Sequence, residues 1–191
     1  MALLIWQRPF HCALFVTADR MVQKRRKNMN ASGKTKIRVI VTGAVIAALY
    51  AAVTLVLAPI SYGPIQFRIS EVLTVLPFFT PAAVPGLFIG CALANIASPL
   101  GPIDTIAGSA ATLLAAWLTY KMPTKWLAPL PPVICNGVIV GLELHFLLHV
   151  PLLATMASVA FGEAVVCFVG GIPLMLGLGK VQDRLFPSTT R

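Results

Sequence analysis

Charged residues are scarce in this chain of 191 residues: they make up 11% of it, whereas they usually make up about a quarter of a soluble domain. Hydrophobic residues account for 58%, and the mean hydropathy is +0.85. This composition excludes an ordinary soluble enzyme, and it also excludes a disordered chain, which needs low hydrophobicity. It predicts an integral membrane protein.

The motifs of catalytic and metal sites are also missing. No pair among the four cysteines has the C-x-x-C spacing of a zinc or redox site. There is no G-x-S-x-G nucleophile motif and no H-E-x-x-H zinc motif, and we interpret His145 and His149 as residues at a membrane surface. Gly33-Lys34-Thr35 resembles the end of a phosphate-binding loop, but Asn28 stands where that loop needs a glycine. The sequence therefore predicts no catalytic activity.

Strand-like alternation is absent, and the body of the chain is a series of apolar runs separated by Pro, Gly and charge. The runs favour six helices, at 37–58, 69–79, 86–97, 103–120, 127–148 and 152–178. A bilayer core takes about 20 residues of helix, and the second run is short, since an α-helix of its length rises about 17 Å. The predicted fold class is all-α, an integral membrane bundle of six transmembrane helices.

Basic residues are concentrated ahead of the first run. Residues 1–36 hold eight Lys or Arg residues and one Asp, a net charge of +7, whereas the net charge of residues 37–191 is +2. Because loops rich in Lys and Arg stay inside, we expect cytoplasmic N- and C-termini. The predicted domains are a basic segment at 1–36, a transmembrane domain at 37–180 and a cytoplasmic tail at 181–191. We also expect synthesis to begin at Met21 or Met29.

A few ionisable and amide side chains fall within the apolar runs, where they are costly and usually mark a functional site. They are Arg68, Glu71, Asn95, Asp104, Asn136, Glu143 and Glu163. With the expected orientation, most of them lie in the outer half of the membrane, and the inner half is nearly free of charge between its basic loops. This layout predicts a pocket that is open to the exterior and closed below by packed apolar side chains.

Most of these residues also have a structural interpretation. Arg68 and Glu71 are three residues apart and can pair with each other on a helix. Asp104 can cap the helix that follows the turn at 98–102.

The amides and the remaining carboxylates leave similar alternatives. Asn95 and Asn136 can bridge helices by hydrogen bonding, and Glu143 can be solvated at the interface. Glu163 is the hardest to explain structurally, because an unpaired carboxylate within a span is expensive.

A stripe of small residues follows one face of the first run. Ala44, Ala48 and Ala52 recur every four residues, a spacing that lets a second helix approach closely in lipid. The stripe predicts a helix–helix contact, either within this chain or with a partner subunit.

Long stretches of the chain resemble a known family. The segment 64–95 reads PIQFRISEVLTVLPFFTPAAVPGLFIGCALAN and is similar to the signature of the QueT family, substrate-binding S-components of energy-coupling factor (ECF) transporters. The resemblance continues through DTIAGSAATLLAAWLTY at 104–120, LAPLPPVICNGVIVGLEL at 127–144 and FGEAVVCFVGGIPL at 161–174. It covers residues 37–180 and leaves residues 1–36 outside.

The resemblance implies a multi-pass protein of the cell membrane that takes up a queuosine precursor, a deazaguanine base related to queuine. Such a chain binds the solute and docks on a transmembrane coupling protein and two ABC-type ATPases. The partner ATPases use the ATP, so the resemblance implies no catalysis, no bound cofactor and no nucleic acid for this chain. It also places Ala44, Ala48 and Ala52 at the contact with the coupling protein.

A deazaguanine solute then suggests a role for each polar residue. Glu163 or Glu71 can accept its N1–H and 2-amino group together, and a cationic aminomethyl group would suit Glu143 or Asp104. The predicted binding set also includes Asn136, groups for the carbonyl oxygen (Asn95, Arg68) and rings that stack on the base (Phe67, Tyr62).

Two alternatives remain open at this stage. The chain can be an S-component for another vitamin-like molecule, or a self-sufficient secondary carrier or channel. The second alternative requires a polar path that continues to the inner face.

Overall fold

The computed structural model describes residues 33, 35–62 and 67–182. The chain divides into two compact units, Met1–Val39 and Ile40–Arg191. In the first unit, residues 33 and 35–39 are helical. The predicted start sites, Met21 and Met29, and residues 183–191 of the predicted tail lie outside the described residues. The contacts and sites below belong to the second unit.

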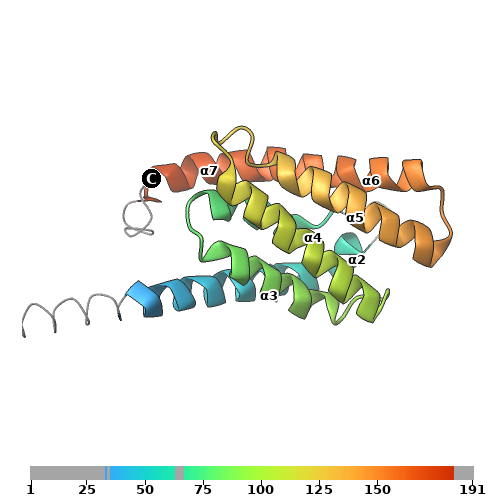
Figure 1. Ribbon diagram of the computed structural model, residues 1–191, viewed down its shortest axis with the longest axis horizontal. Helices are drawn as coiled ribbons and strands as arrows, with labels where there is room; N and C mark the ends of the chain where they lie inside the picture. Colours follow the sequence, from blue (N-terminus) through green and yellow to red (C-terminus); the bar gives the residue numbers. More distant parts are fainter. Residues whose placement is uncertain (1–32, 34, 63–66, 183–191) are drawn as a thin grey trace, which may run out of the picture. The chain divides into compact units, whose positions relative to one another are not determined.

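The described residues form helices and turns with no strand among them, which confirms the all-α prediction (Figure 1). In chain order the elements are a helix at Thr35–Val56, α2 (Ala58–Ser61), the 3₁₀ helix η1 (Ile69–Phe78), α3 (Ala83–Asn95), α4 (Pro102–Lys121), α5 (Leu130–Leu148), α6 (Leu152–Ala164), the π-helical η2 (Val165–Gly171) and α7 (Ile172–Gly179). Within this part of the chain, three helical runs are long and apolar enough to cross a membrane: Thr35–Val56, Leu130–Leu148 and Leu152–Gly179. The count of six spans stays a prediction.

The short second run is a 3₁₀ helix, which corrects the α-helical rise expected for it. A 3₁₀ helix rises about 2.0 Å per residue, so the ten residues of η1 extend about 20 Å. Pro77 lies inside it, and the Thr74 hydroxyl donates to the Glu71 carbonyl within the same turn. Side chains three apart are aligned in this geometry, so Arg68, Glu71 and Thr74 follow one buried side.

The last run is continuous from α6 through η2 to α7, and its middle is a π-helix. Pro173, at the start of α7, has no N–H to donate to the carbonyl four residues earlier, and that carbonyl lies within η2. Here Gly170 and Gly171 meet η1: a methyl group at Gly170 would lie 2.6 Å from Val72 Cγ2. The glycines therefore let the last run pack directly on η1.

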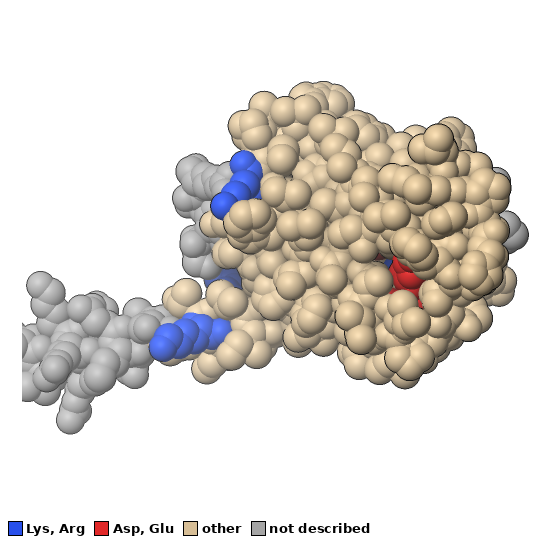
Figure 2. Space-filling view, turned by 45° about the vertical axis from the view of Figure 1, so that its right-hand side comes forward, with Lys and Arg blue, Asp and Glu red and all other residues tan. Residues whose placement is uncertain are grey.

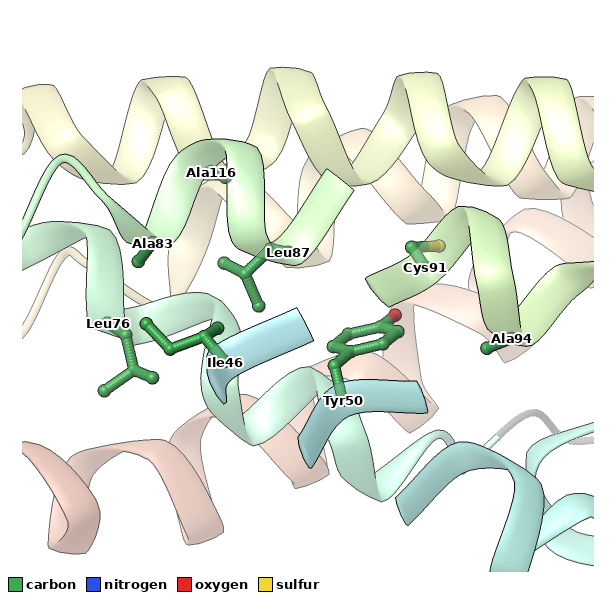
Figure 3. Close-up of a cluster of buried hydrophobic side chains, with 8 residues drawn as sticks. All are labelled: Ile46, Tyr50, Leu76, Ala83, Leu87, Cys91, Ala94 and Ala116. Atoms are coloured by element: carbon green, nitrogen blue, oxygen red, sulfur yellow. The ribbon is translucent and has the colours of Figure 1, made fainter. Parts of the chain in front are cut away.

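Small residues also bring the first helix onto α3. A methyl group at Gly86 would lie 2.6 Å from the Gly43 carbonyl oxygen, and one at Gly90 would lie 2.8 Å from that of Ala47. Around this contact lies an apolar core drawn from several helices (Figure 3). It comprises Ile46, Tyr50, Leu76, Ala83, Leu87, Cys91, Ala94 and Ala116.

The polarity of the unit is inverted relative to a soluble protein. Large apolar side chains face outward, with Leu153 81% exposed, Val56 79% and Ile106 73%. All four acidic residues in the described part of the chain are buried. An apolar exterior is favourable in contact with lipid and costly in water.

The connections between helices gather at two opposite ends (Figure 1). The segments 96–101 and 149–151 lie at one end, where α5 finishes with His149 in the left-handed conformation. The segments 79–82 and 122–129 lie at the other end, together with the end of α7. The predicted cytoplasmic lysines, Lys121, Lys125 and Lys180, all belong to this second end.

Candidate functional site

Seven polar side chains in the second unit are buried although they fall in apolar runs. They are Arg68 beside η1, Glu71 in η1, Asn95 in α3, Asp104 in α4, Asn136 and Glu143 in α5, and Glu163 in α6. These are the ionisable and amide residues that the sequence selects, and the fold brings them in from five elements. Figure 2 shows acidic atoms at the bottom of an opening in a surface that is otherwise almost free of charge at that end.

The Glu71 carboxylate has one bonded and one open oxygen. The Tyr50 hydroxyl donates a hydrogen bond to Oε1, whereas Oε2 has no partner although it is buried. The Glu71 backbone carbonyl accepts from Thr74 and, at 3.5 Å, from the Cys167 thiol. One oxygen of this carboxylate is thus held by the protein, and the other is buried without a hydrogen-bond partner.

Arg68 does not form the ion pair with Glu71 that the sequence allowed. No carboxylate oxygen of the described residues lies within 4.0 Å of the Arg68 guanidinium. Its Nη1 lies 3.7 Å from Cys91 Sγ, its Cζ lies 5.6 Å from the centroid of the Tyr62 ring, and its Nε is buried without a partner. Arg68 therefore presents an unused donor within the site.

Asn136 bridges two helices by hydrogen bonding, which is the structural role that its sequence position allowed. Its Nδ2 donates to Glu163 Oε1 at 2.9 Å, and Cys167 Sγ lies 3.6 Å from Glu163 Oε2. Both oxygens of Glu163 are engaged, whereas Asn136 Oδ1 is buried without a partner. The Glu163 contact uses the amide nitrogen and leaves the amide oxygen free to accept.

Asn95 and Asp104 form a second pair across α3 and α4. Asn95 Nδ2 donates to the Asp104 backbone carbonyl at 3.0 Å, while Asn95 Oδ1 and Asp104 Oδ2 have no partner. A methyl group at Gly108 would lie 2.5 Å from Asn95 Nδ2, so the pair requires glycine there. Asp104 does not cap α4: the cap residue is Gly101, and the cap has no side-chain hydrogen bond.

Glu143 has no hydrogen bond that supports its carboxylate. It is 7% exposed, and neither carboxylate oxygen has a hydrogen-bond partner. Asp104 and Arg68 are the charged groups that interact with it electrostatically. Burial removes the alternative of a solvated residue at the interface.

Of the two predicted stacking residues, Tyr62 is the one with a contact to the cluster, through Arg68. Tyr62 is half-buried and its hydroxyl donates to the Ala94 carbonyl at 2.8 Å, while Phe67 is half-buried beside Arg68 in the sequence. Tyr62 also lines a cavity of about 480 Å³ at the end of the unit that has few charges. The cavity is lined by Tyr62, Pro99, Leu100, Leu144, Leu148, Val150, Ala154, Thr155, Ser158 and Val159. This volume is typical of small-molecule sites, and Tyr62 is the member of the predicted binding set that lines the cavity.

The unsatisfied polar atoms are confined to the predicted site. Among the described residues, seven buried side-chain atoms lack a hydrogen-bond partner: Arg68 Nε, Glu71 Oε2, Asn95 Oδ1, Asp104 Oδ2, Asn136 Oδ1 and both oxygens of Glu143. Six of the seven are acceptors. An uncompensated buried polar group costs about 1–3 kcal/mol, so a ligand rich in hydrogen-bond donors would relieve a large penalty here.

Two supporting residues are not apparent from the sequence. Tyr50 is fully buried on the first helix, and its hydroxyl points toward the α3 face that carries Cys91 (Figure 3). Cys167 contacts both Glu71 and Glu163. Tyr50 and Thr54 lie one turn apart on the inward face, and that spacing of polar groups was the available signal.

The predicted partner stripe lies on the outside of the first helix. Ala44, Ala48 and Ala52 are exposed, while Ala47 on the neighbouring stripe is buried against α3. Packing within the second unit therefore leaves the predicted stripe uncovered.

Comparison with known proteins gives two findings. A family model described as QueT transporter matches residues 40–180. The chain is 35% identical over 166 residues to a curated protein of Lactococcus lactis subsp. cremoris (strain MG1363) named Queuosine precursor transporter QueT, an alignment that covers 78% of this chain and 97% of that protein. No solved structure matches the chain.

Proposed function

Because this chain belongs to the QueT transporter family, we propose that it is the membrane substrate-binding component of an ATP-driven ECF importer for a queuosine precursor. In this proposal the chain binds a deazaguanine base from the exterior. It then docks on a transmembrane coupling protein with two ABC-type ATPases and releases the base inward.

The observation that carries the proposal is the set of buried polar atoms without partners. Six acceptors and one donor lie unsatisfied on residues in η1, α3, α4 and α5 and on Arg68 just before η1. A deazaguanine has the complementary pattern, because its ring N–H groups and 2-amino group donate and its carbonyl oxygen accepts. Binding would exchange several desolvation penalties for hydrogen bonds.

The contacts support a specific division of roles. Glu71 accepts the N1–H and the 2-amino group, since its Oε2 is open, whereas both oxygens of Glu163 are already engaged. Asn136, held by Glu163, presents its Oδ1 to a further ring donor. Arg68 Nε is the one unpartnered donor among the buried side chains of the described part, and it meets the carbonyl oxygen.

The amide of Asn95 takes a different role from the one its sequence suggested. Its Nδ2 is used by Asp104, so it offers an acceptor rather than a donor to the solute. Tyr62 stacks on the ring from the cavity side, and Phe67 stands beside Arg68 as a second aromatic contact.

The distribution of lysines supports an outward-facing site. Lys121, Lys125 and Lys180 belong to the end of the unit opposite the cavity, and basic connections stay in the cytoplasm. The cavity and the opening with acidic atoms then face the exterior (Figure 2). Six spans with both termini inside complete this topology, in the cell membrane.

The coupling partner is assigned to the exposed stripe of the first helix. Ala44, Ala48 and Ala52 leave a shallow strip on which a partner helix can approach closely, a main route to helix association in lipid. The partner ATPases hydrolyse ATP, so this chain binds no cofactor of its own.

Binding by the purified chain tests the proposal. We expect radiolabelled deazaguanine bases to bind saturably and to be displaced by unlabelled deazaguanine, while excess riboflavin, thiamine and biotin do not compete. Displacement by one of those vitamins would instead favour an S-component for another vitamin-like molecule. Absence of deazaguanine binding by folded protein would contradict the proposed substrate.

A further inference from the structure

Glu163 lies within the long apolar run of α6, η2 and α7, and its carboxyl group contacts only uncharged groups of the described residues. The side chain is 6% exposed. Asn136 Nδ2 donates to Oε1 at 2.9 Å, and Cys167 Sγ lies 3.6 Å from Oε2. A buried negative charge needs a cation or several strong donors, and one amide and one thiol compensate it poorly.

A second carboxyl group, that of Glu71, belongs to the same cluster. Cys167 Sγ lies 3.5 Å from the Glu71 backbone carbonyl, so this one thiol contacts both acidic residues. Glu71 and Arg68 are the charged residues that interact electrostatically with Glu163. Arg68 forms no ion pair with either carboxylate in the described part of the chain, and its Nη1 lies 3.7 Å from Cys91 Sγ instead. Two like charges in one buried cluster repel each other, and such a pair commonly retains one proton.

The hydrogens around Cys167 indicate which of the two residues holds that proton. The thiol has one hydrogen, and two acceptors lie at similar distances from it, the Glu71 carbonyl and Glu163 Oε2. Thr74 Oγ1 is 3.8 Å from the sulfur, but its hydrogen is donated to the Glu71 carbonyl. A proton on Glu163 Oε2 completes this set of bonds, because the acid then donates to Sγ while the thiol donates to the carbonyl.

The contacts of Glu71 suit the ionised member of the pair. The Tyr50 hydroxyl donates to its Oε1, and a donor of this kind favours the charged form of a carboxyl group. A protonated Glu163 still accepts from Asn136, since Oε1 is then the carbonyl oxygen of the acid. One proton on Glu163 therefore preserves every contact described above and removes one of two neighbouring buried charges.

We propose that Glu163 is protonated in the absence of solute and acts as a positioning residue, which holds the Asn136 amide through Oε1 and donates its proton to Cys167. This inference rests on the proposed function, in which Asn136 Oδ1 accepts from the base. Glu163 then acts on the solute through Asn136 and makes no contact of its own with the base. The negative charge of the pair is kept on Glu71, where Oε2 is open.

Infrared spectroscopy of the purified full-length chain without solute tests the protonation. We expect the spectrum of the wild type minus that of Glu163→Gln, at neutral pH, to contain the C=O stretching band of a protonated carboxylic acid, which moves in heavy water. If the difference instead contains the bands of an ionised carboxylate, the inference is overturned. This measurement uses no solute, so its result is independent of the proposed function.

Binding by two variants tests the positioning role, with radiolabelled queuine and 7-aminomethyl-7-deazaguanine as the probes and thermal unfolding as the check of folding. Glu163→Met removes the acceptor for Asn136 and should lower the affinity about 2- to 10-fold, the effect of one neutral hydrogen bond. Glu163→Gln should rescue most of this loss, because its amide accepts from Asn136 and donates to Cys167 as the protonated acid does.

Glu71→Gln is the matched control, since it makes the same substitution in the member of the pair that keeps its charge, and here the amide should not restore binding. Equal losses in Glu163→Gln and Glu163→Met would overturn the neutral role of Glu163. Affinity unchanged in Glu163→Met would overturn the positioning role. Failure of the folded wild type to bind either probe would overturn the proposed function, while the infrared result would still decide the protonation of Glu163.

Discussion

At the scale of single residues, the carboxylate of Glu71 shows how the protein prepares one side of a group and leaves the other side open. Tyr50 saturates Oε1 from the first helix, and Thr74 and Cys167 bind the backbone carbonyl of the same residue. These contacts fix where Oε2 points without consuming it. In the proposed function, an acceptor held in this way would lose little entropy when the solute binds.

Glu71→Gln is expected to reduce the affinity for a deazaguanine about 10- to 100-fold. The substitution removes a charged acceptor and introduces an amide N–H₂ group, which cannot accept a bond from the ligand's donors. The affinity is measured by titration of the purified variant, with thermal unfolding as the check that it folds.

Tyr50→Phe is the control for this substitution, because it removes the supporting hydroxyl but keeps the open oxygen of Glu71. Its loss of affinity should be smaller than that of Glu71→Gln, because the Tyr50 hydroxyl supports the carboxylate and leaves the proposed acceptor in place. Affinity equal to the wild type in Glu71→Gln would move base recognition to Glu163.

The candidate residues could be predicted because a charge inside an apolar run is conspicuous. Their partners could not, since the bond from Asn136 to Glu163 joins residues 27 apart in sequence and depends on how α5 meets α6. Tyr50 escaped notice for a related reason: a tyrosine or a cysteine within an apolar helix usually only fills space.

At the scale of the elements, proline and glycine made several boundaries predictable, although the run predicted at 86–97 begins at Ala83 and contains Pro85. The run predicted at 103–120 is α4, Pro102–Lys121, and the run predicted at 152–178 ends at Gly179 in α7. The hydrogen-bonding pattern inside the runs was not predictable, because an apolar segment suits 3₁₀, α and π geometry alike. The 3₁₀ turns of η1 and the π turns of η2 arise where these two elements pack through Gly170 and Gly171.

The two alanine stripes of the first helix make a prediction about partner binding. Ala48→Trp is expected to abolish uptake in cells while the purified variant still binds its solute, since the bulky ring blocks a close helix contact on the outside. Uptake of radiolabelled solute and binding to detergent-purified protein are measured in parallel.

A tryptophan at another exposed position separates this effect from insertion of a large side chain. Leu153→Trp on α6 lies at a position that is 81% exposed and outside the stripe, and it should keep most of the uptake. Loss of uptake in both variants, or in neither, would contradict the assignment of the stripe to the coupling protein.

At the scale of the whole molecule, polar and apolar layers succeed one another along the second unit. The cavity lies at the end opposite the lysines, and apolar side chains pack together elsewhere in the unit. One cluster there consists of Val75, Phe79, Ala128 and Met175, with Phe78, Leu174 and Leu178 packed against it. In the proposed orientation, this packing would close the route from the proposed site to the cytoplasmic side, because a polar solute would have to displace well-packed apolar side chains.

This closure predicts that the chain alone binds its solute but does not transport it. Proteoliposomes that contain only this protein should retain bound deazaguanine at the stoichiometry of the sites and accumulate none beyond that, with or without an ion gradient. Co-reconstitution with the coupling protein and its two ATPases should produce accumulation that requires hydrolysable ATP, because inward release then follows from docking rather than from a channel through the helices.

Ala48→Trp supplies the matched control, since it should eliminate the ATP-dependent accumulation without changing the bound amount. Accumulation by the chain alone, driven by a sodium or proton gradient, would identify a secondary carrier and refute the ECF proposal.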